Sequence, residues 1–194
     1  MARALSLPML LTWARIAMVP LVVGVFYLPD GWIAPSWKNI TACSLFTLAA
    51  ITDAFDGYLA RRYGQTSQLG AFLDPVADKL MVCAALVVLL WLQRIDSVVA
   101  LVIIGREIAV SALREWMARV GASRSVAVSS LGKIKTVAQM IAIPVLLFHD
   151  PLFGVIDLRP IGTALIYLAA VLTTYSMLYY LKLAWPHLEQ EEHH

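Results

Sequence analysis

The sequence predicts an all-α, polytopic membrane protein with six transmembrane helices. Hydrophobic residues make up 60% of the 194 residues and charged residues only 14%, whereas a soluble domain carries about a quarter charged residues. A water-soluble core cannot hide so much apolar surface, but a bilayer can. The apolar residues also gather in segments of about 20 or more, long enough to cross roughly 30 Å of hydrocarbon. Short polar joints separate these segments.

The six expected spans follow one another along the chain. They cover residues 7–28, 38–62, 70–93, 97–119, 127–148 and 160–184. The first span superficially resembles a signal peptide, but Arg15 interrupts it and no small-residue cleavage site closes it. We therefore expect a retained first helix. The predicted organisation is a single six-helix transmembrane domain over residues 1–187, which carries the active site, followed by a polar tail over residues 188–194.

Basic residues near the span ends predict the orientation in the membrane. An even number of spans places both termini on one side. Six basic residues fall on that side, namely Arg3, Arg61, Arg62, Arg119, Arg124 and Lys182, and three fall on the other, namely Lys38, Arg94 and Arg159. Because short cytoplasmic loops carry an excess of Lys and Arg, both termini are expected in the cytoplasm. The net charge of +2 is too small to indicate nucleic acid as a partner.

Four carboxylates lie inside the second and third expected spans. They are Asp53, Asp56, Asp74 and Asp78. A charge at this depth costs at least a few kcal/mol, so such residues are functional candidates. Helical spacing places the first two within an arc of roughly 100° on one helix and the last two on one stripe of the next. The joint between these spans is short, so the helices are antiparallel neighbours and the four carboxylates can converge near the cytoplasmic surface.

The chemistry of this cluster predicts metal binding. Four converging carboxylates cannot all ionise in a low-dielectric groove without cations between them. Oxygen ligands without His or Cys suit Mg²⁺ or Mn²⁺, which they do not distinguish. Two ions would leave open positions for phosphate oxygens, as in-line displacement at phosphorus requires. Gly57 and Ala60 on the same face leave room for a substrate, although small residues also favour plain helix packing.

The spacing of these residues resembles the signature of the CDP-alcohol phosphotransferase family at all eight positions over 26 residues. The chain reads Asp53-x-x-Asp56-Gly57-x-x-Ala60-Arg61, then eight residues, then Gly70-x-x-x-Asp74-x-x-x-Asp78. The resemblance implies that the first three aspartates bind two divalent metal ions. It also implies that Asp78 completes the metal site and acts as the general base on the acceptor hydroxyl. Residues implied to bind the CDP moiety are Asp56, Gly57, Ala60, Arg61 and Gly70.

Basic residues in the second half predict an acceptor that carries its own phosphate. The candidates are Arg106, Arg114, Lys133 and Lys135, with Arg15 and Lys79 as less specific additions. Fixed cations of this kind can bind a phosphate, which Arg holds bidentately. The two lysines of the fifth span differ by about 200° around the helix, so we expect one to face inward and the other to snorkel to the interface. The alternative is that Glu107 and Arg114 belong to a structural ion-pair network.

Nearly the whole chain resembles one bacterial branch of this family. The similar stretches are 8–15, 52–79, 105–117 and 125–140. The resemblance implies CDP-diacylglycerol as donor, sn-glycerol 3-phosphate as acceptor, and a homodimer in the bacterial cytoplasmic (inner) membrane with its active site facing the cytoplasm. A cardiolipin or phosphatidylinositol-phosphate synthase with the same core is the nearest alternative.

A divalent-cation transporter is the alternative from a different class. Transporters of this kind place their ligands near the midplane between matched halves. Here the carboxylates gather toward one face and the halves do not match. A membrane scaffold without catalysis is also disfavoured, because it would carry four buried charges without using them.

Overall fold

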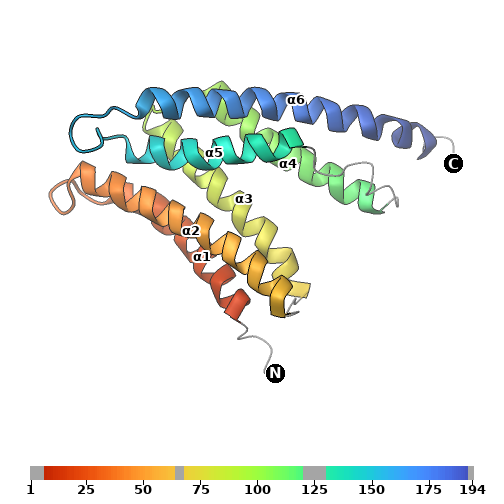
Figure 1. Cartoon of the computed structure of the whole chain (residues 1–194), viewed down its shortest axis with the longest axis horizontal. Helices are drawn as coiled ribbons and strands as arrows, with labels where there is room; N and C mark the ends of the chain where they lie inside the picture. The colour runs from red at the N-terminus through yellow and green to blue at the C-terminus, as the bar shows by residue number, and fades with distance from the viewer. Residues whose placement is uncertain (1–6, 64–67, 120–129, 192–194) are drawn as a thin grey trace. The chain divides into compact units, whose positions relative to one another are not determined.

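The computed structural model describes residues 7–63, 68–119 and 130–191, which form six α-helices and one short 3-10 helix (Figure 1). The elements are α1 (Leu7–Gly24), η1 (Val25–Tyr27), α2 (Pro35–Tyr63), α3 (Gln68–Trp91), α4 (Ser97–Arg119), α5 (Ser130–Phe148) and α6 (Arg159–Glu191). Within these helices the side chains of residues 7–8, 54, 56–63, 68–69, 71, 130–133 and 186–191 lie outside the described part. The predicted all-α class is confirmed.

The helices begin and end close to the expected spans, with two instructive differences. Helix α2 begins at Pro35, before the expected residue 38, because proline suits the first turn of a helix. Helix α6 runs on to Glu191, beyond the expected residue 184, through the polar end of the chain. Both helices therefore extend past their apolar segments.

Two segments of the described residues are long and apolar enough to span a membrane by composition alone. They are Met9–Tyr27 and Arg159–Trp185, and the apolar segment Ile134–Phe148 of α5 is shorter. Helices α2, α3 and α4 each carry charged residues among their apolar ones. These charged residues include the candidate functional residues discussed below.

The chain divides into two compact units. The first unit comprises Met1–Arg94 and Ile143–Pro160, and the second comprises Ile95–Ala142 and Ile161–His194. In the first unit, α1 packs against both α2 and α3. Buried residues of this unit include Val22, Phe46 and Leu86, and the second unit has an apolar cluster in which α4 and α6 meet.

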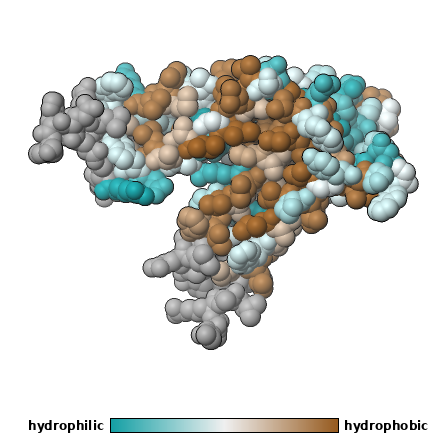
Figure 2. Space-filling view, turned by 180° about the vertical axis from the view of Figure 1, so that it is seen from behind, coloured by the Kyte–Doolittle hydropathy of each residue, from teal (hydrophilic) through white to brown (hydrophobic). Residues whose placement is uncertain are grey.

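Large apolar side chains also point outward on the helices. Trp13 is 51% exposed, Leu101 is 72% exposed and Val171 is 66% exposed. Figure 2 shows apolar residues, in brown, over much of the visible face. A water-soluble protein avoids exposing so many apolar side chains together, whereas contact with lipid requires them.

A polar network closes one end of the first unit, away from the motif aspartates. Arg94 Nη1 donates to the carbonyl oxygens of Leu146 at 3.1 Å and Leu147 at 2.7 Å. Its Nη2 donates to Asn39 Oδ1 at 2.7 Å, and Asn39 Nδ2 donates to Asp150 Oδ2 at 2.9 Å. The last carbonyls of a helix have no partner within it, so Arg94 caps α5 and ties it to the start of α2.

His149, which follows α5, is expected to make stability depend on pH. Burial lowers the pKa of His149 from its ordinary value of 6.5, and the nearby Arg94 and Arg159 lower it further, while Asp150 and Asp157 oppose them. The unfolded chain therefore takes up a proton before the folded protein does, so stability is full above pH 6.5 and falls as the pH drops below it.

The test replaces His149 by Asn, which tolerates the φ of +57° at this position. Melting of the detergent-solubilised protein is measured at pH 7.5 and pH 5.5. The wild type is expected to lose more melting temperature than His149→Asn between these two pH values. Equal losses would show that another group governs this pH dependence.

Candidate active site

Two aspartates of the motif are bound by the same face of α1. Arg15 Nη1 lies 2.7 Å from Asp53 Oδ1, and Thr12 Oγ1 donates to Asp74 Oδ1 at 2.6 Å. Thr12 and Arg15 are one helical turn apart, and each is 1% exposed. Figure 1 shows the start of α1, the end of α2 and the start of α3 together at one end of this bundle. Helix α1 thus brings carboxylates of α2 and α3 to neighbouring positions.

The remaining motif residues are only partly described. Asp74 and Asp78 are one turn apart on α3 and both are partly buried, as is Gly70 on the preceding turn. The side chains of four motif residues in α2 lie outside the described part, namely Asp56, Gly57, Ala60 and Arg61. The convergence of all four carboxylates therefore stays a prediction.

The described carboxylate oxygens have the chemistry that a hard divalent cation requires of its ligands. Asp53 and Asp74 offer carboxylate oxygens from two helices that meet on α1, and oxygen ligands suit Mg²⁺ or Mn²⁺. Among the side chains that the structure describes, no three His, Cys, Asp or Glu residues form a group that could hold a metal ion. The side chain of Asp56, a member of the motif, is not among those described.

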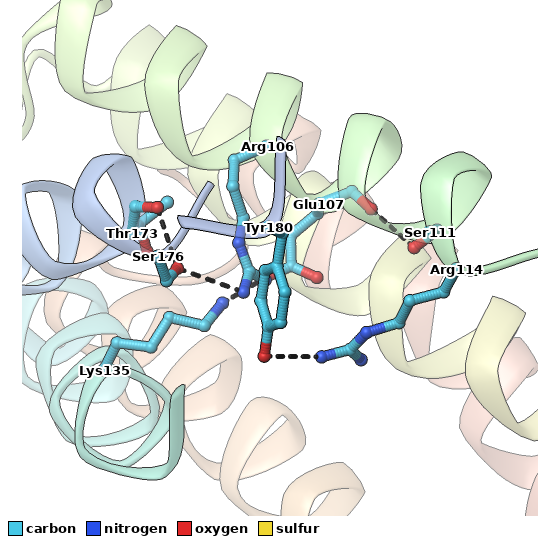
Figure 3. Close-up of polar contacts among 8 residues, drawn as sticks. All are labelled: Arg106, Glu107, Ser111, Arg114, Lys135, Thr173, Ser176 and Tyr180. Carbon is cyan, nitrogen blue, oxygen red and sulfur yellow. Dashed lines mark hydrogen bonds and ion pairs between the residues drawn. The ribbon is translucent and has the colours of Figure 1, made fainter. Parts of the chain in front are cut away.

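The second unit holds two of the predicted phosphate-binding cations around one carboxylate (Figure 3). Lys135 Nζ on α5 lies 2.8 Å from Glu107 Oε1 on α4, and Arg106 Nη1 lies 2.9 Å from the same oxygen. Lys135 is 3% exposed and Arg106 is 6% exposed. Glu107 therefore holds two buried cations close together. Burying these charges costs desolvation free energy, which the attraction within the ion pairs offsets only when their geometry is good.

Helix α6 contributes polar contacts that the sequence analysis did not anticipate. Arg106 Nη2 donates to Ser176 Oγ at 3.4 Å. Arg114 Nη2 donates to Tyr180 OH at 3.2 Å, and Arg114 Cζ lies 5.2 Å from the centre of that ring, a cation–π distance. A signal was present in the sequence, because Thr173, Ser176 and Tyr180 form a polar stripe at helical spacing in a predominantly apolar span.

The described contacts of Glu107 differ from the alternative in which Glu107 and Arg114 share an ion-pair network. The ion pairs of Glu107 among the described side chains join it to Arg106 and Lys135, whereas Arg114 contacts Tyr180 and is exposed. Lys135 is buried, and the side chain of Lys133 lies outside the described part. No described residue accepts a hydrogen bond from the buried Nε of Arg106. Two buried cations thus contact one carboxylate, an arrangement that suits an anionic ligand.

Fold and site together define an all-α membrane protein with acidic residues bound between adjacent helices and buried cations on others. The family model described as CDP-alcohol phosphatidyltransferase matches residues 5–175. The chain therefore belongs to this family, which confirms the resemblance inferred from the aspartate motif.

Relatives with curated names are similar over nearly the whole chain. A CDP-diacylglycerol–glycerol-3-phosphate 3-phosphatidyltransferase of Pseudomonas fluorescens is 46% identical, over 96% of this chain and 94% of the relative. Proteins of the same name from Pectobacterium atrosepticum and Escherichia coli K12 are 48% and 45% identical, each over 92% of this chain and 94% of the relative.

Proposed function

We propose that this chain transfers a phosphatidyl group from CDP-diacylglycerol to sn-glycerol 3-phosphate and thereby makes phosphatidylglycerol phosphate and CMP. The observation that carries this proposal is the similarity, over more than nine tenths of both chains, to proteins named for that donor and acceptor. The geometry of each unit supports it, as the following paragraphs argue.

The donor side of the reaction belongs to the aspartate motif. Asp53, Asp56 and Asp74 would hold two divalent ions, Mg²⁺ or Mn²⁺, together with Asp78. When bound, such ions draw negative charge from the donor pyrophosphate. The contacts of α1 to two of these aspartates support the assignment, because ligating carboxylates are commonly oriented by further hydrogen bonds. The proposed CDP-binding residues are Asp56, Gly57, Ala60, Arg61 and Gly70.

Bond making and breaking follow a direct displacement. The acceptor hydroxyl oxygen forms a bond to the phosphorus that carries the diacylglycerol, and Asp78 takes the hydroxyl proton. The bond from that phosphorus to the bridging oxygen breaks, and CMP leaves with the electron pair. A single displacement needs no covalent enzyme intermediate.

The acceptor phosphate is assigned to the cations of the second unit. Arg106 and Lys135 are held close together by Glu107, and the Arg106 Nε–H has no described acceptor. A buried hydrogen-bond donor without an acceptor costs free energy. A phosphate oxygen that accepts a hydrogen bond from this N–H removes that cost, which favours phosphate binding here. Arg114 and Lys133 complete the proposed set.

An acceptor panel tests the proposal. The purified protein receives CDP-diacylglycerol, a divalent metal and one radiolabelled acceptor at a time: glycerol 3-phosphate, inositol phosphate or phosphatidylglycerol. Lipid product is expected with glycerol 3-phosphate alone. Product from inositol phosphate or phosphatidylglycerol, with none from glycerol 3-phosphate, would assign the chain to another branch of the family.

The cellular setting forms part of the same proposal. Bacterial relatives support the cytoplasmic (inner) membrane of a bacterium, and the excess of basic residues at one set of span ends supports both termini and the active site facing the cytoplasm. The family resemblance supports a homodimer surrounded by membrane lipids. Mass measurement of the detergent-solubilised protein, corrected for bound detergent, tests the dimer.

A further inference from the structure

We infer that helix α1 is part of the metal-binding apparatus, with Thr12 and Arg15 as positioning residues for Asp74 and Asp53. This inference deepens the proposed function and rests on it. The aspartate motif itself contains no residue of α1, because it begins at Asp53. The two residues act through the carboxylates, and for Arg15 this role replaces the phosphate contact considered from the sequence.

The geometry of the contacts is suited to orienting ligands. Each contact engages one carboxylate oxygen, Oδ1, at 2.7 Å for Asp53 and 2.6 Å for Asp74. A carboxylate has a second oxygen with lone pairs. It can therefore accept a hydrogen bond from α1 with one oxygen while the other oxygen ligates a cation. Fixing one oxygen restricts the rotation of the carboxyl group and thereby directs the other.

The placement of the two donors argues against an ordinary helix-packing contact. Thr12 and Arg15 occupy successive turns on one face of α1, yet each contacts a different helix. Both are 1% exposed, so the guanidinium of Arg15 lies where an unpaired charge would be expensive. An apolar residue would pack α1 at lower cost at either position. The two polar residues instead orient the carboxyl groups of Asp53 on α2 and Asp74 on α3.

Thr12 permits the sharper test. Thr12→Val keeps the shape of the side chain but removes the hydroxyl, whereas Thr12→Ser restores it. Thr41→Val is the matched control, because the Thr41 hydroxyl is exposed and donates to a backbone carbonyl of its own helix. Binding of Mn²⁺ to the purified protein is measured without substrate, from the signal of free Mn²⁺ in electron paramagnetic resonance, alongside the melting temperature without metal.

The inference predicts a Mn²⁺ affinity that is about 10- to 100-fold weaker in Thr12→Val, the effect typical of residues that orient metal ligands. Thr12→Ser and Thr41→Val should bind like the wild type. Arg15→Lys, which keeps the positive charge but not the guanidinium geometry, should also weaken binding. An unchanged Mn²⁺ affinity in Thr12→Val, even with a lowered melting temperature, would overturn the role of Thr12 and leave a structural contact. The same result in Arg15→Lys would overturn the role of Arg15.

The proposed function fails in a distinguishable way. If the wild type binds no Mn²⁺ and makes no lipid product with any acceptor, the metal-dependent transferase itself is wrong. If the wild type binds Mn²⁺ and makes product while Thr12→Val and Arg15→Lys both bind Mn²⁺ as tightly as the wild type, only the inference about α1 is wrong.

Discussion

Replacing Asp78 by Asn is expected to abolish turnover while largely sparing the fold. Asn matches the size of Asp and fits the partly buried position on α3, but it cannot take the proton of the acceptor hydroxyl. Loss of a general base typically slows a reaction about 100- to 10,000-fold, and any loss of metal affinity adds to this. The measurement is the rate of CMP release with CDP-diacylglycerol, glycerol 3-phosphate and saturating metal.

Asp96→Asn is the matched control for this variant. Asp96 is exposed and its Oδ1 accepts from the backbone N–H of Val98 at 2.7 Å, so its replacement should leave activity near the wild-type rate. Melting temperatures of both variants check the fold. Activity of Asp78→Asn close to that of the wild type would remove Asp78 from the role of base.

Replacing Lys135 by Met should raise the KM for glycerol 3-phosphate. Met has a similar length and is apolar, and Glu107 retains its ion pair with Arg106, so no buried carboxylate is left without a cation. A hydrogen bond to a charged group contributes about 1.5–3 kcal/mol, which corresponds to about a 10- to 150-fold loss in kcat/KM. The KM for CDP-diacylglycerol should change far less.

Arg119→Met provides the comparison for this prediction. Arg119 and its partner Glu115 are 75% and 67% exposed on the same helix as Arg106, and an exposed pair of this kind contributes little. Both kinetic constants of Arg119→Met should therefore stay near the wild-type values. An unchanged KM for glycerol 3-phosphate in Lys135→Met would show that the acceptor phosphate binds elsewhere.

Much of the fold could be predicted because the bilayer imposes strong rules on a sequence. Apolar segments of sufficient length, separated by polar joints, located all six helices, and α4 has the expected bounds of 97–119. The ends of α1 and α6 were less predictable. Helix α1 ends at Gly24 and the 3-10 helix η1 follows. Helix α6 continues beyond its apolar segment through polar residues, which can form a helix outside the bilayer. Hydropathy locates a helix by its apolar residues, so it does not predict where a helix ends among polar residues.

The sequence supports a site prediction where the residues follow one another at fixed spacing. The aspartates of α2 and α3 belong to one motif, so periodicity predicts that they lie on facing stripes, and among the described contacts Asp53 and Asp74 both bind residues of α1. Arg15 was grouped with the acceptor cations from its charge, whereas the structure pairs it with Asp53. Thr12, Ser176 and Tyr180 form hydrogen bonds with partners more than 60 residues away in the chain. Spacing in one sequence carries no information about such long-range contacts.

The most direct test of the central claim is the release of CMP from CDP-diacylglycerol before and after removal of divalent metal. The purified protein is treated with chelator, supplied with both proposed substrates, and then given Mg²⁺ or Mn²⁺. The carboxylate-bound metal site predicts no CMP without metal, and equal amounts of CMP and phosphatidylglycerol phosphate once metal is restored. Full activity in the presence of chelator, or no CMP under any of these conditions, would contradict it.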